Sequence, residues 1–189
     1  MASKVEICNL ALQELGERRI TSLEEQTEEA RHASLAFDHV RKATIRLHPW
    51  NSTTARASLP KEVAVPAWGY SNSYPLPGDV LCVYDVDYDG DLPWRVEGRK
   101  LLTDIDSPLG ILYGRDETDT ESFDPLLTEA LSLALAVRLC EPLTQSNTKK
   151  AQLQAALDMT LSTAKGVDGR EQSPGEIEED PWIAARYRR

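Results

Sequence analysis

The chain has 189 residues, of which 41% are hydrophobic and 28% are charged, and its formal net charge is −10. This length suits one compact domain or a domain with a small insertion, and the acidic balance argues against a protein that grips nucleic-acid phosphates with clustered lysines and arginines. No apolar run approaches the roughly 20 residues that span a bilayer, and no secretory signal is expected, because the first residues lack a basic start followed by an apolar stretch.

The first predicted helix covers residues 5–15, where apolar side chains recur at helical spacing. Ser3 and Glu6 precede it as an S-x-x-E capping box, which can satisfy the free amides at the start of a helix. Gly16 follows the last apolar residue and predicts a left-handed stop.

The second helix is predicted to begin at Ser22 and Glu25, another S-x-x-E pair. Its apolar residues form one continuous stripe, with acidic residues in the first turns and basic residues toward the end, as the helix dipole favours. It should run to His48, because Pro49 cannot continue it. Trp50 follows directly, which raises the question of what a large aromatic packs against where a helix ends.

Residues 51–122 are rich in proline, glycine and aromatic residues and predict a small antiparallel β lobe. The segment 92–103 is expected to form a hairpin around Glu97 and Gly98. The expected strands lie at 79–86, 94–98, 99–104 and 110–115.

A third helix should follow, with Asp124 as its cap and Pro125 in its first turn. Residues 126–140 are apolar nearly all round, which predicts the buried centre of a bundle, and Pro142 should end or kink the helix. The fourth helix is predicted at 146–165, with Gly166 as its stop.

The sequence therefore predicts an α+β fold. Residues 1–50 and 123–166 form a bundle of about four helices, 51–122 are an inserted β lobe, and 167–189 are an extended tail. The tail is acidic within 171–180 and then basic in its last residues, "PWIAARYRR". Large apolar side chains gain nothing from exposure to solvent in a free tail, so docking of the tail on another subunit is favoured over a frayed end. The candidate interface residues are Trp182, Ile183, Arg186, Tyr187, Arg188 and Arg189.

The segment from Asp85 to Gly90 matches the start of a calcium loop, D-x-D-x-D-G. The twelfth position should be a bidentate glutamate, but Val96 stands there, and the flanks resemble strands instead of helices. A turn with solvated aspartates is therefore favoured, and a calcium-binding interaction module remains an alternative.

No catalytic, metal or cofactor site is predicted. His32 and His39 lie two turns apart, too far for a metal-binding pair, and no cysteine or histidine has a second ligand at usable spacing. A hydrolase that uses aspartate and histidine is a weaker alternative, because no nucleophile–base pair can be proposed. The odd number of distant cysteines, Cys8, Cys82 and Cys140, favours a reducing compartment.

Aromatic residues cluster where the helices meet the β region. Most are expected to fill the core of the lobe, although large aromatics are also favoured at protein interfaces. The cluster consists of Trp50, Trp68, Tyr70, Tyr74 and Trp94.

The order of several short motifs resembles the tail tubular protein A family, the head-to-tail adaptor (gatekeeper) proteins of tailed bacteriophages. The chain departs from the family's pattern at two places. The family often has an aromatic residue and an alanine directly after the asparagine, where this chain has Ser52 to Thr54, and Gly78 is unusual before Asp79. The match extends over most of the chain. The matching residues are His48-Pro49-Trp50, Trp68, Tyr70, Tyr74, Leu76-Pro77, Asp79, Glu97-Gly98 and Phe123-Asp124-Pro125.

The resemblance implies a structural protein of the virion neck without enzymatic activity or cofactor, made in the host cytoplasm. It implies a ring of identical subunits, commonly a dodecamer, that binds the portal protein above and a tail or nozzle protein below. DNA would pass through the lumen without specific binding, repelled by acidic groups over about 8 Å at physiological salt, and no membrane is involved. Trp50 would anchor the chain where it leaves the bundle. Another neck protein, for head completion or as a stopper, is the alternative within phage structure.

Overall fold

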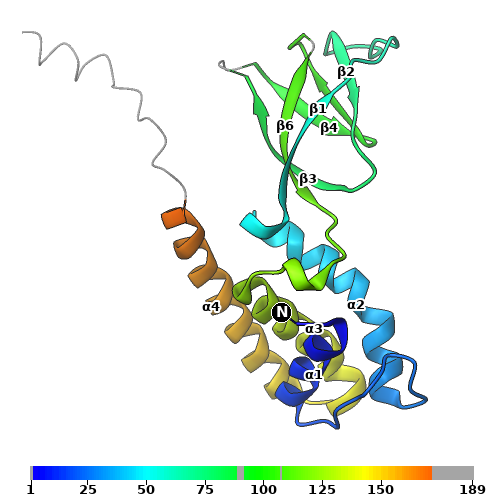
Figure 1. The fold of residues 1–189 in the computed structure, drawn as a ribbon, viewed down its shortest axis with the longest axis vertical. Coiled ribbons are helices and arrows are strands. Elements are labelled where there is room, and N and C mark those ends of the chain that lie inside the picture. The colour runs from blue at the N-terminus through cyan, green and yellow to red at the C-terminus, as the bar shows by residue number, and fades with distance from the viewer. Residues whose placement is uncertain (1, 89–91, 107, 172–189) are drawn as a thin grey trace, which may run out of the picture.

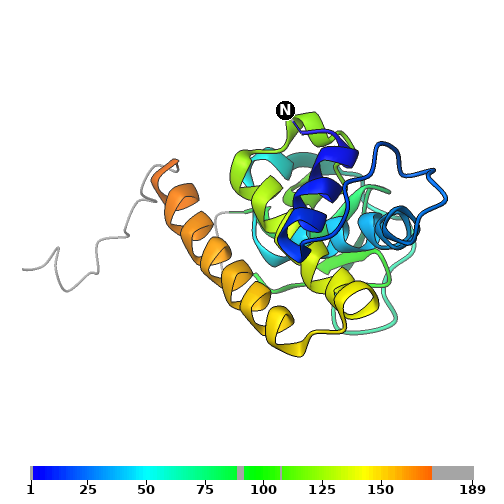
Figure 2. The ribbon, with the colours of Figure 1, turned by 90° about the horizontal axis from the view of Figure 1, so that it is seen from below.

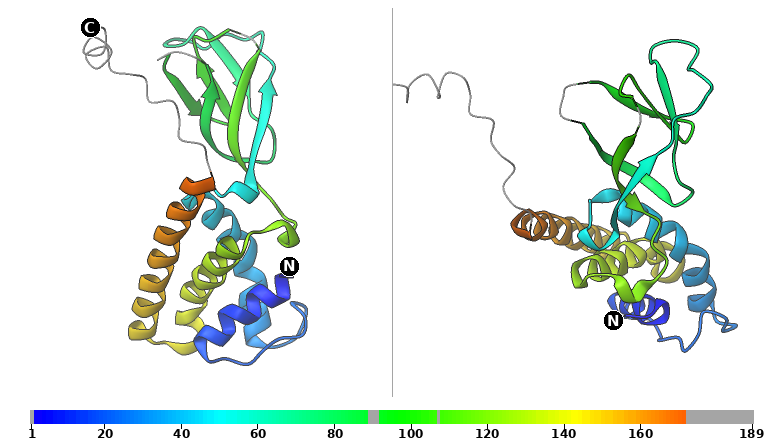
Figure 3. Two further views of the ribbon diagram at one scale, coloured as in Figure 1. Left: turned by 60° about the vertical axis from the view of Figure 1, so that its left-hand side comes forward. Right: turned by 45° about the horizontal axis from the view of Figure 1, so that its top comes forward.

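The computed structural model describes residues 2–88, 92–106 and 108–171. Within them the α+β fold is confirmed: four α-helices form a bundle, and two small antiparallel sheets form a β lobe (Figure 1). The lobe stands on the end of the bundle at which α2 ends (Figure 3).

Helix α1 (Lys4–Leu15) has the ends that the sequence predicts. The amide of Glu6 donates to the Ser3 hydroxyl at 3.2 Å, and the amide of Ser3 donates to the Glu6 carboxylate at 2.6 Å. Gly16 ends the helix with φ 79°, a left-handed conformation that glycine adopts without steric cost.

Helix α2 (Glu28–Leu47) begins later than predicted, and the capping box at Ser22 and Glu25 is wrong. The Glu25 carboxylate instead accepts from the amides of Thr21 at 2.6 Å and Ser22 at 3.2 Å, so it closes a turn. The cap is Thr27, whose hydroxyl accepts from the amide of Ala30. The helix ends before His48, which is extended, as expected ahead of a proline.

Helix α3 (Pro125–Thr144) lies at the centre of the bundle and packs against the other three helices. Asp124 caps it, accepting from two amides of the first turn. Pro142 does not end it: the helix continues to Thr144, and Gln145 terminates it with φ 53° while its amide donates to two carbonyls of the last turn.

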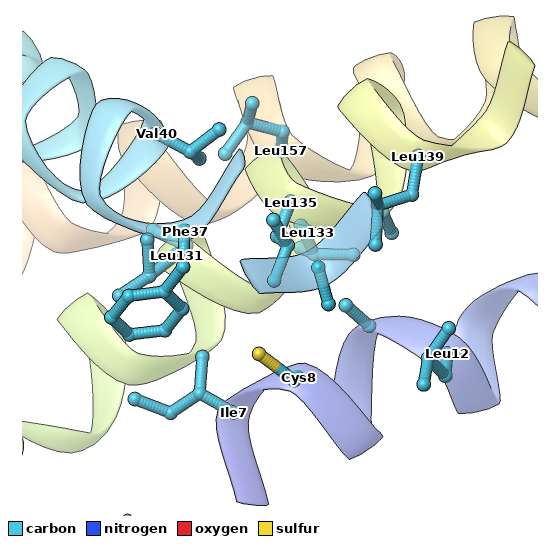
Figure 4. Packing of buried hydrophobic residues seen from close by; sticks show 14 of the residues in the cluster. Ile7, Cys8, Leu12, Phe37, Val40, Leu131, Leu133, Leu135, Leu139 and Leu157 are labelled. Atoms are coloured by element: carbon cyan, nitrogen blue, oxygen red, sulfur yellow. The ribbon is translucent and has the colours of Figure 1, made fainter. Parts of the chain in front are cut away.

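Helix α4 (Asn147–Glu171) runs along one side of the bundle (Figure 2) and is about 37 Å long at 1.5 Å per residue. The predicted stop at Gly166 is wrong, because this glycine stays helical and α4 continues past it. Glycine ends a helix only where the backbone turns left-handed. Leucines of α3 fill the space between the helices, as Figure 4 shows for Leu131, Leu133 and Leu135.

The β lobe contains two three-stranded antiparallel sheets that share one core. The first has the order β1-β6-β3 and the second β2-β5-β4. Strands β3 to β6 lie within about two residues of their predictions, whereas β1 and β2 were not predicted. The bounds are β1 Thr54–Leu59, β2 Asn72–Pro75, β3 Val80–Asp87, β4 Trp94–Glu97, β5 Lys100–Thr103 and β6 Leu109–Arg115, with 3-10 turns at Asn51–Thr53 and Thr120–Ser122.

The hairpin between β4 and β5 is confirmed. Its two-residue turn lies one residue later than predicted, at Gly98 and Arg99, with φ 53° and 63°, and Glu97 is the last residue of β4. Two successive positive φ angles match the right-handed twist of the paired strands. The Arg99 side chain donates to the carbonyl of Pro77 at 2.6 Å, so the turn is tied to the segment that leads into β3.

Candidate functional site

Trp50 lies where α2 leads into the β lobe, and its side chain is fully buried in the core of the bundle. The indole Nε1–H donates to the carbonyl of Thr44 at 3.1 Å, and the ring meets His48 edge-on with centroids 4.8 Å apart. The Trp50 carbonyl accepts from the Thr53 amide and the Thr54 hydroxyl. Trp50 therefore closes the core and also fixes the first residues that lead into β1.

A buried arginine ties α2 to the segment that follows β6. Arg41 is 2% exposed, and its Nη1 lies 2.7 Å from the Asp116 carboxylate as a charged pair without the angles of a hydrogen bond. The same nitrogen donates to the carbonyl of Glu117, and Lys42 lies 2.9 Å from the other oxygen of Asp116. Burial raises the pKa of Asp116, but its contacts with the two cations together outweigh this and hold the pKa below its usual range.

Strand β3 also contacts α2. Arg46 donates to the carbonyl of Leu81 at 3.0 Å, and the Tyr84 hydroxyl reaches the carbonyl of His48 at 3.5 Å. Burial raises the pKa of Tyr84, and the neighbouring Cys82 raises it further. With Trp50 and Arg41, these contacts connect the end of α2 to β1, β3 and the end of β6. We call this region the junction, and it fixes the lobe relative to the bundle.

A groove of about 720 Å³ lies between α2 and α4, with α3 beneath it. Val40, Leu139 and Leu157, labelled in Figure 4, contribute to its apolar lining. Leu35 and Leu47 also line it, and they are 77% and 56% exposed. The sequence predictions did not identify this groove.

The groove also carries polar groups, and two of its three charged side chains are cationic. Arg138 and Lys150 line it from α3 and α4, and His32 and His39 line it from α2. Glu141 is the one carboxylate among its lining residues, and it pairs with Lys150 at 3.0 Å. The groove thus combines exposed apolar surface with a positive rim.

A second exposed apolar surface lies on the β lobe, in the loop 60–71 between β1 and β2. Val63 is fully exposed, and Trp68 is 86% exposed. The expectation that the aromatic residues mostly fill the lobe's core is wrong for Trp68 and also for Trp50, which belongs to the bundle; Tyr74 does lie in the lobe's core. A concavity of about 370 Å³ lies between this loop and the strands β4 and β5.

The candidate residues of the tail lie outside the described part of the chain. They are Trp182, Ile183, Arg186, Tyr187, Arg188 and Arg189. Their docking on a partner stays a prediction.

Asp85 and Asp87 of the calcium alternative lie on β3, whereas the rest of that motif, from Asp89 to Gly90, is outside the described residues. Within the described ranges, no three His, Cys, Asp or Glu side chains are grouped to hold a metal ion. Asp85 uses one carboxylate oxygen to accept from the amide of Val86 at 2.8 Å. In the same part of the chain, no helix combines the length and apolarity that a membrane span requires.

Comparison with known proteins adds no assignment. A scan against models of protein families finds no match, and a search of curated proteins finds none either.

Proposed function

We propose that the chain is a structural subunit of a virion, a head-to-tail adaptor that forms a ring below the portal of a tailed bacteriophage. The observation that carries this proposal is the pair of separate apolar surfaces, one on the bundle and one on the lobe. The groove exposes Leu35 and Leu47, and the loop 60–71 exposes Val63 and Trp68. Exposed apolar surface on a soluble protein commonly marks an interaction site.

Two different surfaces are what a ring requires. In a cyclic assembly each subunit meets its two neighbours through different faces, so one face must complement the other. The junction supports this arrangement, since Arg41 pairs with Asp116 after β6 and Trp50 anchors the start of the lobe in the bundle core. Rigid subunits lose little freedom on association, which favours a closed ring over variable aggregates.

The assignment to the adaptor class comes from the resemblance of the motifs to tail tubular protein A. It proposes the portal protein as the upper partner, a tail or nozzle protein as the lower partner, and a dodecameric ring in the virion neck. The terminal residues from Trp182 to Arg189 are proposed to contact the portal or a neighbouring subunit. The net charge of −10 is consistent with a conduit that repels DNA.

Electron microscopy of the purified chain, alone and mixed with the portal of the same phage, tests the proposal. Rings that cap the portal are expected, and deletion of residues 181–189 should reduce capping. A chain that stays monomeric and unbound in the presence of the portal would contradict the proposal. A ring that binds only beneath another neck protein would favour a stopper or head-completion protein instead.

Charge behaviour gives a second arm of the test. The assembled ring should bind duplex DNA weakly at physiological salt, because surface acidic groups repel phosphates within about 8 Å. Tight DNA binding by the ring would refute the conduit role while leaving ring formation itself intact.

A further inference from the structure

We propose that the groove between α2 and α4 is the docking site of residues 176–183 of the same chain. This inference does not depend on the phage assignment, since it concerns the unassembled subunit. It rests on three matched features: the chemistry of the groove, the chemistry of the segment, and the length of chain between them.

The groove needs an occupant with apolar anchors. Leu35 and Leu47 expose most of their surface beside a cavity of about 720 Å³, and burying apolar surface contributes about 25 cal/mol per Å². The segment "EIEEDPWI" supplies Ile177, Trp182 and Ile183. A tryptophan is the side chain that most often dominates such a contact.

The charges are complementary. Arg138 and Lys150 line the groove against one carboxylate, Glu141, so its rim is net positive. The segment carries four carboxylates, and its acidic part immediately precedes the apolar anchors. They are Glu176, Glu178, Glu179 and Asp180.

The last residues of the chain fit the groove less well. Arg186, Arg188 and Arg189 would place positive charge against a rim that is already positive. The register that agrees with both charge and apolarity therefore ends near Ile183, and the arginines remain available to another partner.

The length of the chain also agrees. Leu157 lines the groove fourteen residues before the end of α4 at Glu171, a distance of about 21 Å along the helix. Ser173-Pro174-Gly175 is a turn signal directly after the helix. From Gly175 to Trp182 an extended chain spans about 23 Å, so Trp182 can return to the level of Leu157. A short tether also gives docking within one chain a high effective concentration.

Nuclear magnetic resonance of the full-length, isotope-labelled chain tests the inference. Trp182→Ala should shift the amide signals of groove residues, including Leu35, Leu47 and Val137. The matched control is Trp68→Ala, which removes an exposed tryptophan from the lobe and should leave these signals in place. Unmoved groove signals in Trp182→Ala would overturn the proposal.

A charge swap tests the recognition directly. The double variant R138E/K150E should move the groove signals toward their positions in Trp182→Ala, and adding E178K/E179K should return them toward wild type. Failure of the second pair to restore them would refute the charge match. The wild-type signals should not change on dilution, because the contact is within one chain. Loss of the contact on dilution would show that the occupant comes from a second copy and would also overturn the proposal.

Discussion

Replacing Trp50 with alanine should cost more stability than any other tryptophan substitution among the described residues. Its side chain is fully buried in the bundle core and donates to the carbonyl of Thr44. Removing a buried tryptophan costs about 3–5 kcal/mol through lost burial and the cavity left behind. Loss of the indole hydrogen bond adds about 1 kcal/mol, so the expected total is about 4–6 kcal/mol. That is a large fraction of the roughly 5–15 kcal/mol by which domains are stable.

Urea unfolding followed by far-ultraviolet circular dichroism measures this cost without relying on tryptophan emission. The matched control is Trp68→Ala, which makes the same chemical change at an 86% exposed position and should alter the free energy of unfolding by less than about 0.5 kcal/mol. Trp50→Phe keeps an aromatic ring and loses the hydrogen bond, so it should fall between the two.

The ranking of these three variants is the decisive result. Equal costs for Trp50→Ala and Trp68→Ala would refute the assignment of Trp50 to the bundle core, whatever their absolute size. A Trp50→Phe variant as unstable as Trp50→Ala would show that the hydrogen bond to Thr44, and not burial, holds this end of α2.

Two further predictions concern the junction and the lobe. Asp116→Asn should lower the free energy of unfolding by about 2 kcal/mol near neutral pH. The pKa of this carboxyl is lowered in the folded state, so its stabilisation is present above the unfolded-state pKa and is lost as the pH falls through the folded-state pKa. Urea unfolding at decreasing pH should therefore give free energies of unfolding for variant and wild type that converge. Gly114→Ala would place a Cβ 2.5 Å from the Tyr84 hydroxyl and 2.8 Å from the Cys82 sulfur, which should cost about 1–3 kcal/mol. Gly78→Ala meets nothing within 4 Å and serves as its control, and equal thermal stability of the two glycine variants would contradict the packing at Gly114.

The helix ends show how far local signals determine the structure. Ser3 and Glu6 form the capping box that their spacing predicts, whereas Ser22 and Glu25, with the same spacing, close a turn. The difference lies in Thr21, whose amide and hydroxyl also donate to the Glu25 carboxylate. A sequence with the spacing of a capping box therefore forms a different turn when a neighbouring residue supplies other donors to the glutamate carboxylate.

Strand β2 could not be predicted from apolar alternation because two of its three buried residues, Asn72 and Ser73, are polar. Asn72 donates to the carbonyl of Ile105 at 2.8 Å, and the Ser73 hydroxyl donates to Glu62 at 2.8 Å. Buried polar groups are stable only with such partners, and these partners lie far away in the sequence. Pro75 at the end of the strand further hides the pattern.

The two apolar surfaces depend on tertiary structure in the same way. Leu35 lies off the buried stripe of α2, and nothing in its local sequence shows that α4 will lie across from it to form a groove. Trp68 was expected in a core because large aromatics usually are buried. Trp68 instead lies in the loop 60–71 at the rim of the concavity beside β4 and β5, where it is 86% exposed.

The two ends of the β lobe are neighbours, since Thr54 at the start of β1 pairs with Gly114 near the end of β6. The helical bundle therefore meets the whole lobe as one long loop whose ends lie side by side. Doubling the length of a loop adds only about 0.6 kcal/mol to the entropic cost of closing it. Evolution can therefore lengthen, trim or exchange this insert with little penalty to the helical scaffold. Related chains should differ most in the insert and least in the side chains that clamp its two ends.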